Sequence, residues 1–450
     1  MALGLGILEK YVSQGAFCDS STDYLQPQCH PGTCERVLEM IKGWVHEADV
    51  SSHILWLYGQ AGAGKSAIAQ TIAEYCHQTD NLAASFFFFR ASPDRNTADR
   101  LFPTLAWQLS LSVPGIAPFI SAAIEADPLL PMDSIEIQCE RLIVEPFEHI
   151  AEKYSAMAVP RLIVVIDGVD ECSNEVMQQR FLTLIGDAVD QGRIPLRFLI
   201  CSRPELHIRD AFDRMISSNA TSRLVLDDSV ESHGGIDRYL VDEFERISLE
   251  QGHRVYSWPS QGAIDRLVHN SAGQFIYAST VIKFIDDKYS NPMKQLEIVL
   301  GLRSISSSPF ADLDRLYTEI LSRQPDQGFL ANLIVILLVL STASHLVTIS
   351  SIGIINALLY LEEGKAFSKL HGMHPLLEIT ETLICVRHAS FLEFLQNPTR
   401  CGRYYIGPRE ATRTFLNLLV AAVVRYATMD LKRARYGFFH HLTLASKSLR

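Results

Sequence analysis

Residues Ile54-Leu-Trp-Leu-Tyr58 run directly into Gly59-Gln-Ala-Gly-Ala-Gly64-Lys65-Ser66, and this stretch decides the fold. The apolar run predicts a short buried strand, and the residues from Ala67 to Glu74 predict a helix after the glycine-rich turn. The turn matches the G-x-x-x-x-G-K-[ST] pattern of a phosphate loop in the strand-to-helix context that the motif requires. A glycine-rich turn without a ligand is the disfavoured alternative.

The loop residues have expected roles toward a nucleotide with Mg²⁺. Glycines are expected to leave room for phosphate and to permit positive φ, while backbone N–H groups and the helix N-terminus bind the phosphates. Lys65 would reach the β- and γ-phosphates, and Ser66 would hold Mg²⁺. The predicted nucleotide-binding residues of the loop are Gly59, Gln60, Ala61, Gly62, Ala63, Gly64, Lys65, Ser66 and Ala67.

A second apolar run, Leu162 to Ile166, is followed by Asp167-Gly168-Val169-Asp170-Glu171. An aspartate at the carboxyl end of a buried strand is placed to hold Mg²⁺ together with Ser66, so Asp167 is the second predicted metal ligand. Either Asp170 or Glu171 could polarise a water molecule for attack on the γ-phosphate. The alternative for this acidic cluster is solvated surface.

A third predicted strand, Leu196 to Cys201, ends at Ser202-Arg203-Pro204. Arg203 is therefore expected to sense a γ-phosphate, with a surface ion pair as the alternative. Ligands of such sheets lie beyond the carboxyl ends of the strands. We expect Lys65 and Asp167 to meet around one magnesium–nucleotide complex, brought together by adjacent strands of one sheet.

Length and charge limit the possible classes of protein. A chain of 450 residues with 48% hydrophobic residues predicts two to four domains with buried cores. The formal charge of −11 argues against a dedicated duplex-DNA binder, and we expect no nucleic-acid partner. A locally basic stretch from Arg425 to Arg450 is interpreted as a solvated helix face.

The nine cysteines form no C-x-x-C pair, which favours a reducing compartment over a disulfide framework. Cys29, His30 and Cys34 lie close together, but no second pair with zinc-ligand spacing follows, so ordinary thiols near a turn are favoured.

The N-terminus lacks a basic region before its apolar residues and is not interpreted as a secretory signal. The apolar segment from Phe329 to Leu340 is shorter than the ~20 residues that span a bilayer. It is interpreted as a buried core helix, and we expect a cytoplasmic protein without stable membrane insertion.

The order of patterns predicts an α/β fold with a parallel sheet and helices on both faces, followed by helical and winged-helix subdomains. Short predicted strands at Val347–Ile349 and Leu383–Val386 among helices favour the winged helix. The predicted divisions are a connector (1–28), a nucleotide-binding domain (29–228), a helical domain (229–308), a winged-helix domain (309–400) and the start of a further helical region (401–450).

Several motifs together resemble NACHT-type signal-transduction NTPases of the STAND class, which are related to NOD-like receptors, especially the fungal set with a nephrocystin-like ATPase region. The likeness covers about Gln28 to the end of the sequence. The motifs that carry it are Cys29-His-Pro-Gly-Thr33, Leu55 to Ala69, Ala84-Ser-Phe-Phe-Phe88, Leu101 to Leu109, Val165 to Cys172, Phe198 to Glu205, Ala272 to Ala278 and His388 to Leu395.

The resemblance implies a slow NTPase that acts as an NTP/NDP conformational switch, with ATP or GTP (ATP favoured) at a domain junction. It implies self-association or pairing with full-length relatives, in signalling of the innate-immunity or heterokaryon-incompatibility type. It also implies nucleotide contacts for Pro31 and Thr33, and a contact between His388 and the β-phosphate in the closed state. A hydrogen-bonded core histidine is the alternative for His388.

The chain departs from the family at two positions and in length. Cys34 stands where an arginine is more common, and Gly273-Gln-Phe275 lacks a proline found near the adenine in other branches. The absence of effector and repeat regions leaves three interpretations: a truncated gene model, a fragment or a short regulator. Alternatives to the switch are a turnover ATPase of the AAA-like type, a small-molecule kinase, and a non-hydrolysing nucleotide-binding scaffold.

Overall fold

The computed structural model divides the chain into two compact units, Met1–Glu231 and Ser232–Arg450. The boundary lies three residues beyond the one predicted after residue 228, and the finer subdivision of the second unit stays a prediction. The described residues are 3–20, 27–47, 52–90, 92, 94–153, 162–216, 221–226, 230–250, 258–287, 289–302, 310–342, 352–362, 365–379 and 384–428. The predicted strand at 347–349 and most of the basic stretch at 425–450 lie outside them.

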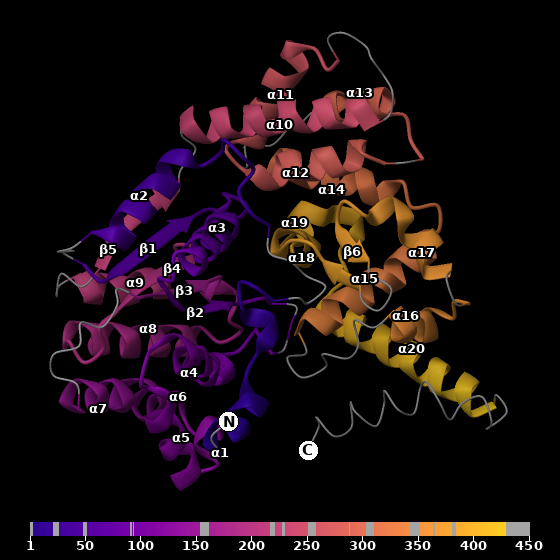
Figure 1. The fold of residues 1–450 in the computed structure, drawn as a ribbon. Helices are drawn as coiled ribbons and strands as arrows, with labels where there is room; N and C mark the ends of the chain where they lie inside the picture. Colours follow the sequence, from indigo (N-terminus) through magenta and orange to yellow (C-terminus); the bar gives the residue numbers. More distant parts are fainter. Residues whose placement is uncertain are drawn as a thin grey trace. The chain divides into compact units, whose positions relative to one another are not determined.

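The first unit is built on a parallel five-stranded sheet with the order β2-β3-β4-β1-β5 (Figure 1). The strands are β1 (Ile54–Gly59), β2 (Leu82–Phe87), β3 (Leu162–Asp167), β4 (Leu196–Ser202) and β5 (Thr221–Leu226). The phosphate-loop strand β1 and the Asp167 strand β3 are not adjacent, because β4 pairs with both. The expectation of adjacent strands was wrong, although all three strands end at the same edge.

Helices cover both faces of the sheet, as predicted. Successive side chains of a strand point to opposite faces. On one face, Trp56 and Val164 belong to the core that includes α4 (Leu101–Ser112), α8 (Glu175–Asp190) and α9 (Leu206–Ile216). On the other face, Leu57 and Val165 belong to the core that includes α2 (Glu35–His46) and α3 (Lys65–Gln78). The continuous apolar runs in the sequence follow from this burial on both sides.

Several helical segments of the first unit were not predicted from the sequence patterns: α1, the stretch from α6 to α7, α8 and α9. The helices are α1 (Leu3–Leu8), α2 (Glu35–His46), α3 (Lys65–Gln78), α4 (Leu101–Ser112), α5 (Ala117–Ala126), α6 (Ile135–Cys139), a π-helical turn (Glu140–Val144), α7 (Glu145–Lys153), α8 (Glu175–Asp190) and α9 (Leu206–Ile216).

The N-terminal residues are part of the first unit rather than a connector. Leu5, Leu8 and Ala16 are buried in the core of this unit. The Gly4 N–H donates to Glu125 of α5 at 3.1 Å, and the Cys18 N–H donates to Ser85 of β2 at 2.9 Å. The connector prediction was wrong for residues 3–20 because their few apolar side chains are anchored by such polar contacts.

The second unit combines helices with a two-stranded antiparallel sheet of β6 (Leu377–Ile379) and β7 (Ile384–Val386). Its helices are α10 (Val230–Glu250), α11 (Gln261–Ser271), α12 (Phe275–Ile285), α13 (Pro292–Gly301), α14 (Ala311–Ser322), α15 (Gln327–Thr342), α16 (Ile352–Leu359), α17 (Lys365–Leu370), α18 (Ala389–Gln396), α19 (Pro398–Cys401) and α20 (Pro408–Thr428). Helices followed by a small antiparallel sheet are compatible with a winged helix, which stays a prediction.

The apolar segment from Phe329 to Leu340 lies in α15, as predicted. Its side chains at Leu330, Leu333, Ile334 and Ile336 are almost fully buried in the core of the second unit. Across the described part of the chain, every helix is too short or too polar to cross a membrane.

Candidate nucleotide-binding site

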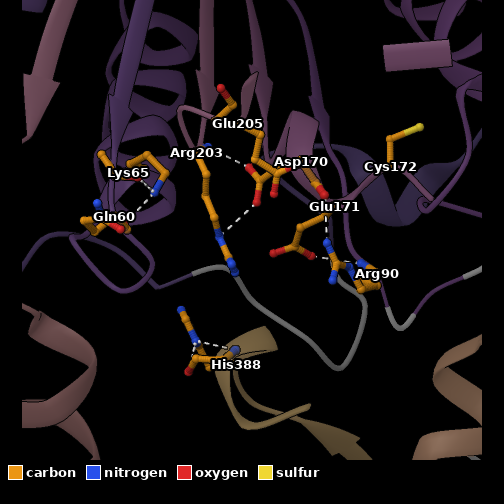
Figure 2. A network of polar contacts seen from close by, with 12 residues as sticks. Gln60, Lys65, Arg90, Asp170, Glu171, Cys172, Arg203, Glu205 and His388 are labelled. Carbon is orange, nitrogen blue, oxygen red and sulfur yellow. Dashed lines mark hydrogen bonds and ion pairs between the residues drawn. The ribbon is translucent and has the colours of Figure 1, made fainter. Parts of the chain in front are cut away.

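The predicted phosphate loop joins β1 to α3, which begins at Lys65. Gly62 and Gly64 have φ values of 76° and 96°, so the positive φ expected of these glycines is confirmed. The Lys65 ammonium donates to the Gly59 and Gln60 carbonyls, at 2.8 Å each (Figure 2). Burial lowers the pKa of Lys65, while the charge of Asp170 opposes that change.

Gly59 is required for a reason that differs from the predicted one. It is the last residue of β1 and pairs with Leu226 of β5. A Cβ at position 59 would lie 2.6 Å from the Leu226 carbonyl oxygen, a backbone atom that cannot move aside easily. The contact with the neighbouring strand therefore excludes a side chain at Gly59.

Asp167 ends β3 and has the features of a metal ligand. The residue is 2% exposed, and its Oδ1 is buried with no hydrogen-bond partner among the described residues. Burial raises the pKa of Asp167 to about 7, while a hydrogen bond from the Ser66 side chain lowers it. An unpartnered buried carboxylate oxygen is costly unless a further group completes it.

Ser66 and Asp167 fit Mg²⁺. This cation takes oxygen ligands and usually keeps several waters, with one or two protein oxygens and the phosphates of a nucleotide. Among the described residues no group of three or more His, Cys, Asp or Glu side chains could hold a metal ion. The two protein oxygens from Ser66 and Asp167 suit a cation that is bound partly through a nucleotide.

Asp170 and Arg203 form a buried ion pair at the same edge of the sheet (Figure 2). The Arg203 backbone N–H donates to Asp170 Oδ1 at 2.9 Å, and Arg203 Nε lies 3.1 Å from Oδ2. Asp170 is 5% exposed, and the Arg203 side chain is 19% exposed. The two oxygens of Asp170 thus hold both the backbone and the guanidinium of Arg203.

Glu171 is held by Arg90, a residue that the sequence patterns did not indicate. The Arg90 backbone N–H donates to Glu171 Oε2 at 2.9 Å, and Arg90 Nη2 donates to the Asp170 carbonyl at 2.8 Å. Burial and the Asp170 charge raise the pKa of Glu171. Arg90 follows the apolar run of β2, so its place beyond a strand's carboxyl end is the signal that could have found it.

Pro31 and Thr33 lie in a turn before α2, beside the phosphate-loop helix. The Cys29 N–H donates to Thr71 of α3 at 3.0 Å. Thr33 is 2% exposed, and its hydroxyl donates to the His30 carbonyl at 2.7 Å. The hydroxyl therefore stabilises the turn, and nucleotide contacts of Pro31 and Thr33 stay predictions.

His388 belongs to the second unit, where it is the N-cap residue of α18. Its Nδ1 accepts a hydrogen bond from the Ser390 N–H at 3.1 Å and lies 2.6 Å from the Ser390 hydroxyl. Since Nδ1 is an acceptor, the neutral ring carries its proton on Nε2. The phosphate contact stays a prediction.

The fold and the loop define a class: the first unit has the P-loop NTPase fold. A family model described as "Nephrocystin 3, N-terminal" matches residues 32–203, which is fewer than half of the 450 residues. The match covers the phosphate loop, Asp167, the acidic turn and Arg203. No curated protein matches the chain.

Three solved structures are similar at low identity. They are Cdc6p from Pyrobaculum aerophilum (11% identity, 88% of this chain, 97% of that chain, TM-score 0.37), the Aeropyrum pernix ORC1 protein in complex with DNA (13%, 80%, 89%, 0.32) and Drosophila ORC bound to AT-rich DNA and Cdc6 (12%, 92%, 69%, 0.30). At these TM-scores the likenesses carry no argument about function. The expected absence of a nucleic-acid partner finds no support in them and stays a prediction.

Proposed function

We propose that the chain binds a nucleoside triphosphate with Mg²⁺ and acts as a nucleotide-dependent conformational switch. The observation that carries this proposal is the pair of Ser66 and Asp167 beside the phosphate loop. Asp167 keeps an unpartnered buried oxygen there, at a cost to stability that a bound cation would offset.

Lys65 would exchange its present acceptors for phosphate oxygens. It now donates to two carbonyls of its own loop, and these bonds hold the ammonium against the loop. Ser66 and Asp167 would hold Mg²⁺, which neutralises charge on the β- and γ-phosphates when it is bound. The lowered pKa of Lys65 agrees with a desolvated cation that gains from an anionic ligand.

Of the two candidates for the catalytic base, Glu171 is the better one. Asp170 is committed through both oxygens to Arg203, whereas Glu171 accepts one hydrogen bond from Arg90. A carboxylate with a raised pKa is a stronger base once it is ionised. Asp170 would then position Arg203, which senses the γ-phosphate.

The switch would couple the nucleotide to the packing of the second unit. A ligand shifts a conformational equilibrium only through different affinities for the two states. His388 with a proton on Nε2 offers a donor suited to phosphate, and its capping contacts link it to α18. Self-association of the open form and a signalling role of the immunity type complete the proposal.

Mass spectrometry of nucleotide released from purified, denatured protein tests the proposal. Diphosphate at close to one per chain is the expected result for a locked switch. A nucleotide-free protein that hydrolyses ATP rapidly would instead favour the AAA-like turnover enzyme. Protein that carries no nucleotide and binds none on titration would overturn the proposed function.

A further inference from the structure

Cys29 and Cys34 flank a tight turn. The Thr33 N–H donates to the His30 carbonyl at 3.0 Å, which closes a four-residue β-turn. Pro31 and Gly32 occupy its central positions, and Gly32 has φ 75°. Proline followed by a residue of positive φ is typical of a type II turn. Such a turn reverses the chain, so the residues on either side of it come close together.

The two thiols are in contact. A hydrogen bond between the Cys29 and Cys34 side chains raises the pKa of Cys29, as does burial. A thiol that donates to a neighbouring sulfur favours the thiolate form of that neighbour. Burial favours the protonated form of Cys29, so its S–H can donate to the Cys34 sulfur.

A second feature favours the Cys34 thiolate. Cys34 is the N-cap residue of α2, a helix of 12 residues. The partial positive charge of a helix N-terminus stabilises a thiolate and raises its reactivity toward disulfides. Cys34 has φ 55°, and its position between the turn and the first residue of α2 fixes this backbone conformation.

Solvent exposure distinguishes Cys29 and Cys34 from most of the other cysteines. Cys29, Cys34 and Cys385 are partly exposed, and the other cysteines are buried. Burial raises the pKa of several of these, Cys76 and Cys139 to about 12, which makes them poor nucleophiles. Within the first unit, a thiol reagent in solution is therefore expected to react with Cys29 and Cys34 before the buried cysteines.

We propose that Cys29 and Cys34 form a reversible dithiol–disulfide site that exchanges with low-molecular-weight disulfides. The Cys34 thiolate attacks one sulfur of the oxidant RSSR, forms a mixed disulfide and releases RS⁻. In the mixed disulfide Cys34 is no longer an anionic acceptor for the Cys29 proton, so the main cause of the raised Cys29 pKa is removed. Cys29 then loses its proton and attacks Cys34 Sγ, forming the internal disulfide and displacing the second RS⁻. The two thiol protons pass to the released thiolates, so one RSSR becomes two RSH.

Oxidation would cross-link the turn that holds Thr33, next to its attachment to α3 at Thr71. If this segment covers a bound nucleotide, which rests on the proposed function, the disulfide should slow nucleotide release several-fold. The formation of the disulfide itself needs no nucleotide. An experiment can therefore contradict the disulfide site without contradicting the proposed nucleotide-binding function, and the reverse also holds.

Equilibration of the purified chain in glutathione buffers, followed by alkylation and mass spectrometry, tests the site. The wild type should lose two hydrogen atoms in oxidising buffer, with the new bond mapped to Cys29 and Cys34 and reversed by dithiothreitol. Cys29→Ser should retain a glutathione adduct on Cys34, because no resolving thiol remains. Cys34→Ser should form neither product in the folded protein.

The matched control is Cys385→Ser, which removes the partly exposed thiol of the second unit and should behave as the wild type does. Full alkylation of Cys29 and Cys34 in folded wild-type protein after oxidation would overturn the proposal. So would a disulfide that pairs either residue with another cysteine. Both of these outcomes are measured on the wild-type protein, so the proposal is tested even if a variant folds poorly.

Discussion

At the scale of single residues, the proposed role of Asp167 as a metal ligand conflicts with stability. Its carboxylate is buried at the end of β3, where the neutral form is favoured and the pKa rises to about 7. A metal ligand must be ionised to bind. The fold thus keeps a group that costs stability without its ligand, as is common for binding sites.

Asp167→Asn should raise the melting temperature of the nucleotide-free, metal-free protein at pH 8. The folded-state pKa of Asp167 lies above the unfolded value, so its contribution to stability falls as pH rises from about 4 to about 7 and stays lost above. Asparagine does not titrate, so the free energy of unfolding at pH 8 should be about 1–4 kcal/mol higher in the variant than in the wild type. Below about pH 4 the two proteins should differ little, because Asp167 is then mostly protonated in both the folded and the unfolded state.

The same variant should lose the stabilisation that Mg²⁺ with nucleotide gives the wild type. Asp190→Asn, at an exposed position at the end of α8, is the control and should change neither property. Thermal melts over a pH series measure both effects. A variant that is less stable at pH 8 and still responds to Mg²⁺ would contradict the assignment of Asp167.

Glu171→Gln and Asp170→Asn should separate the base from the positioning residue. Glu171→Gln should keep triphosphate binding and lower hydrolysis by about 10²–10⁴-fold, since only the base is lost. Asp170→Asn should release Arg203 and weaken the preference for triphosphate over diphosphate. Single-turnover hydrolysis and binding of both nucleotides measure this. Equal hydrolysis by Glu171→Gln and wild type would exclude Glu171 as the base.

At the scale of elements, the strands were predicted well because they are apolar on both faces. The runs at Leu162–Ile166 and Leu196–Cys201 match β3 and β4 closely. Helix α9 was missed because charged residues interrupt its apolar ones. Helix α8 was missed although Phe181, Leu182 and Ile185 have the spacing of one helical face. A search for helical spacing after Asn174, the N-cap residue, could have found α8.

Gly59→Ala and Gly43→Ala should change stability in opposite directions. Gly59→Ala places a Cβ 2.6 Å from the Leu226 carbonyl oxygen and should destabilise the chain by about 1–3 kcal/mol. Gly43 is exposed in α2 with nothing within 4 Å of an added Cβ, so alanine should stabilise it by about 0.5–1 kcal/mol. Denaturant unfolding measures both. A neutral Gly59→Ala would show that β5 does not constrain the loop.

The site was predictable to the extent that it follows strand ends. Lys65, Ser66, Asp167 and Arg203 were placed from motifs, and the structure brings them to one edge of the sheet. The different partners of Asp170 and Glu171, which are Arg203 and Arg90, were not predictable from the sequence patterns. Those contacts join segments that lie far apart in the sequence.

At the scale of the whole molecule, the order of the strands could not be read from the sequence. Apolar runs indicate burial but not which strand pairs with which, so the position of β4 between β1 and β3 came only from the structure. One predicted boundary, after Asp228, where alternating strands and helices give way to helices, lies three residues before the division between the two compact units, and the other predicted boundaries stay predictions.

His388→Ala and His388→Asn should separate capping from nucleotide sensing. Asparagine is a good N-cap residue, so His388→Asn should preserve α18 while it removes the imidazole. Alanine removes both and should also cost about 1 kcal/mol of stability. If His388 contacts the diphosphate, both variants should release it faster than the wild type. Release rates equal to the wild type for His388→Asn would assign this residue to capping alone.

The most direct test of the central claim, that the phosphate loop with Ser66 and Asp167 binds a magnesium–nucleotide complex, is calorimetric titration of nucleotide-stripped protein with MgATP and MgGTP. The account predicts one site per chain in the wild type, the same site in the exposed-lysine control Lys294→Ala, and no measurable binding in Lys65→Ala, where the charge at the β- and γ-phosphates is lost. Unchanged affinity in Lys65→Ala would contradict it.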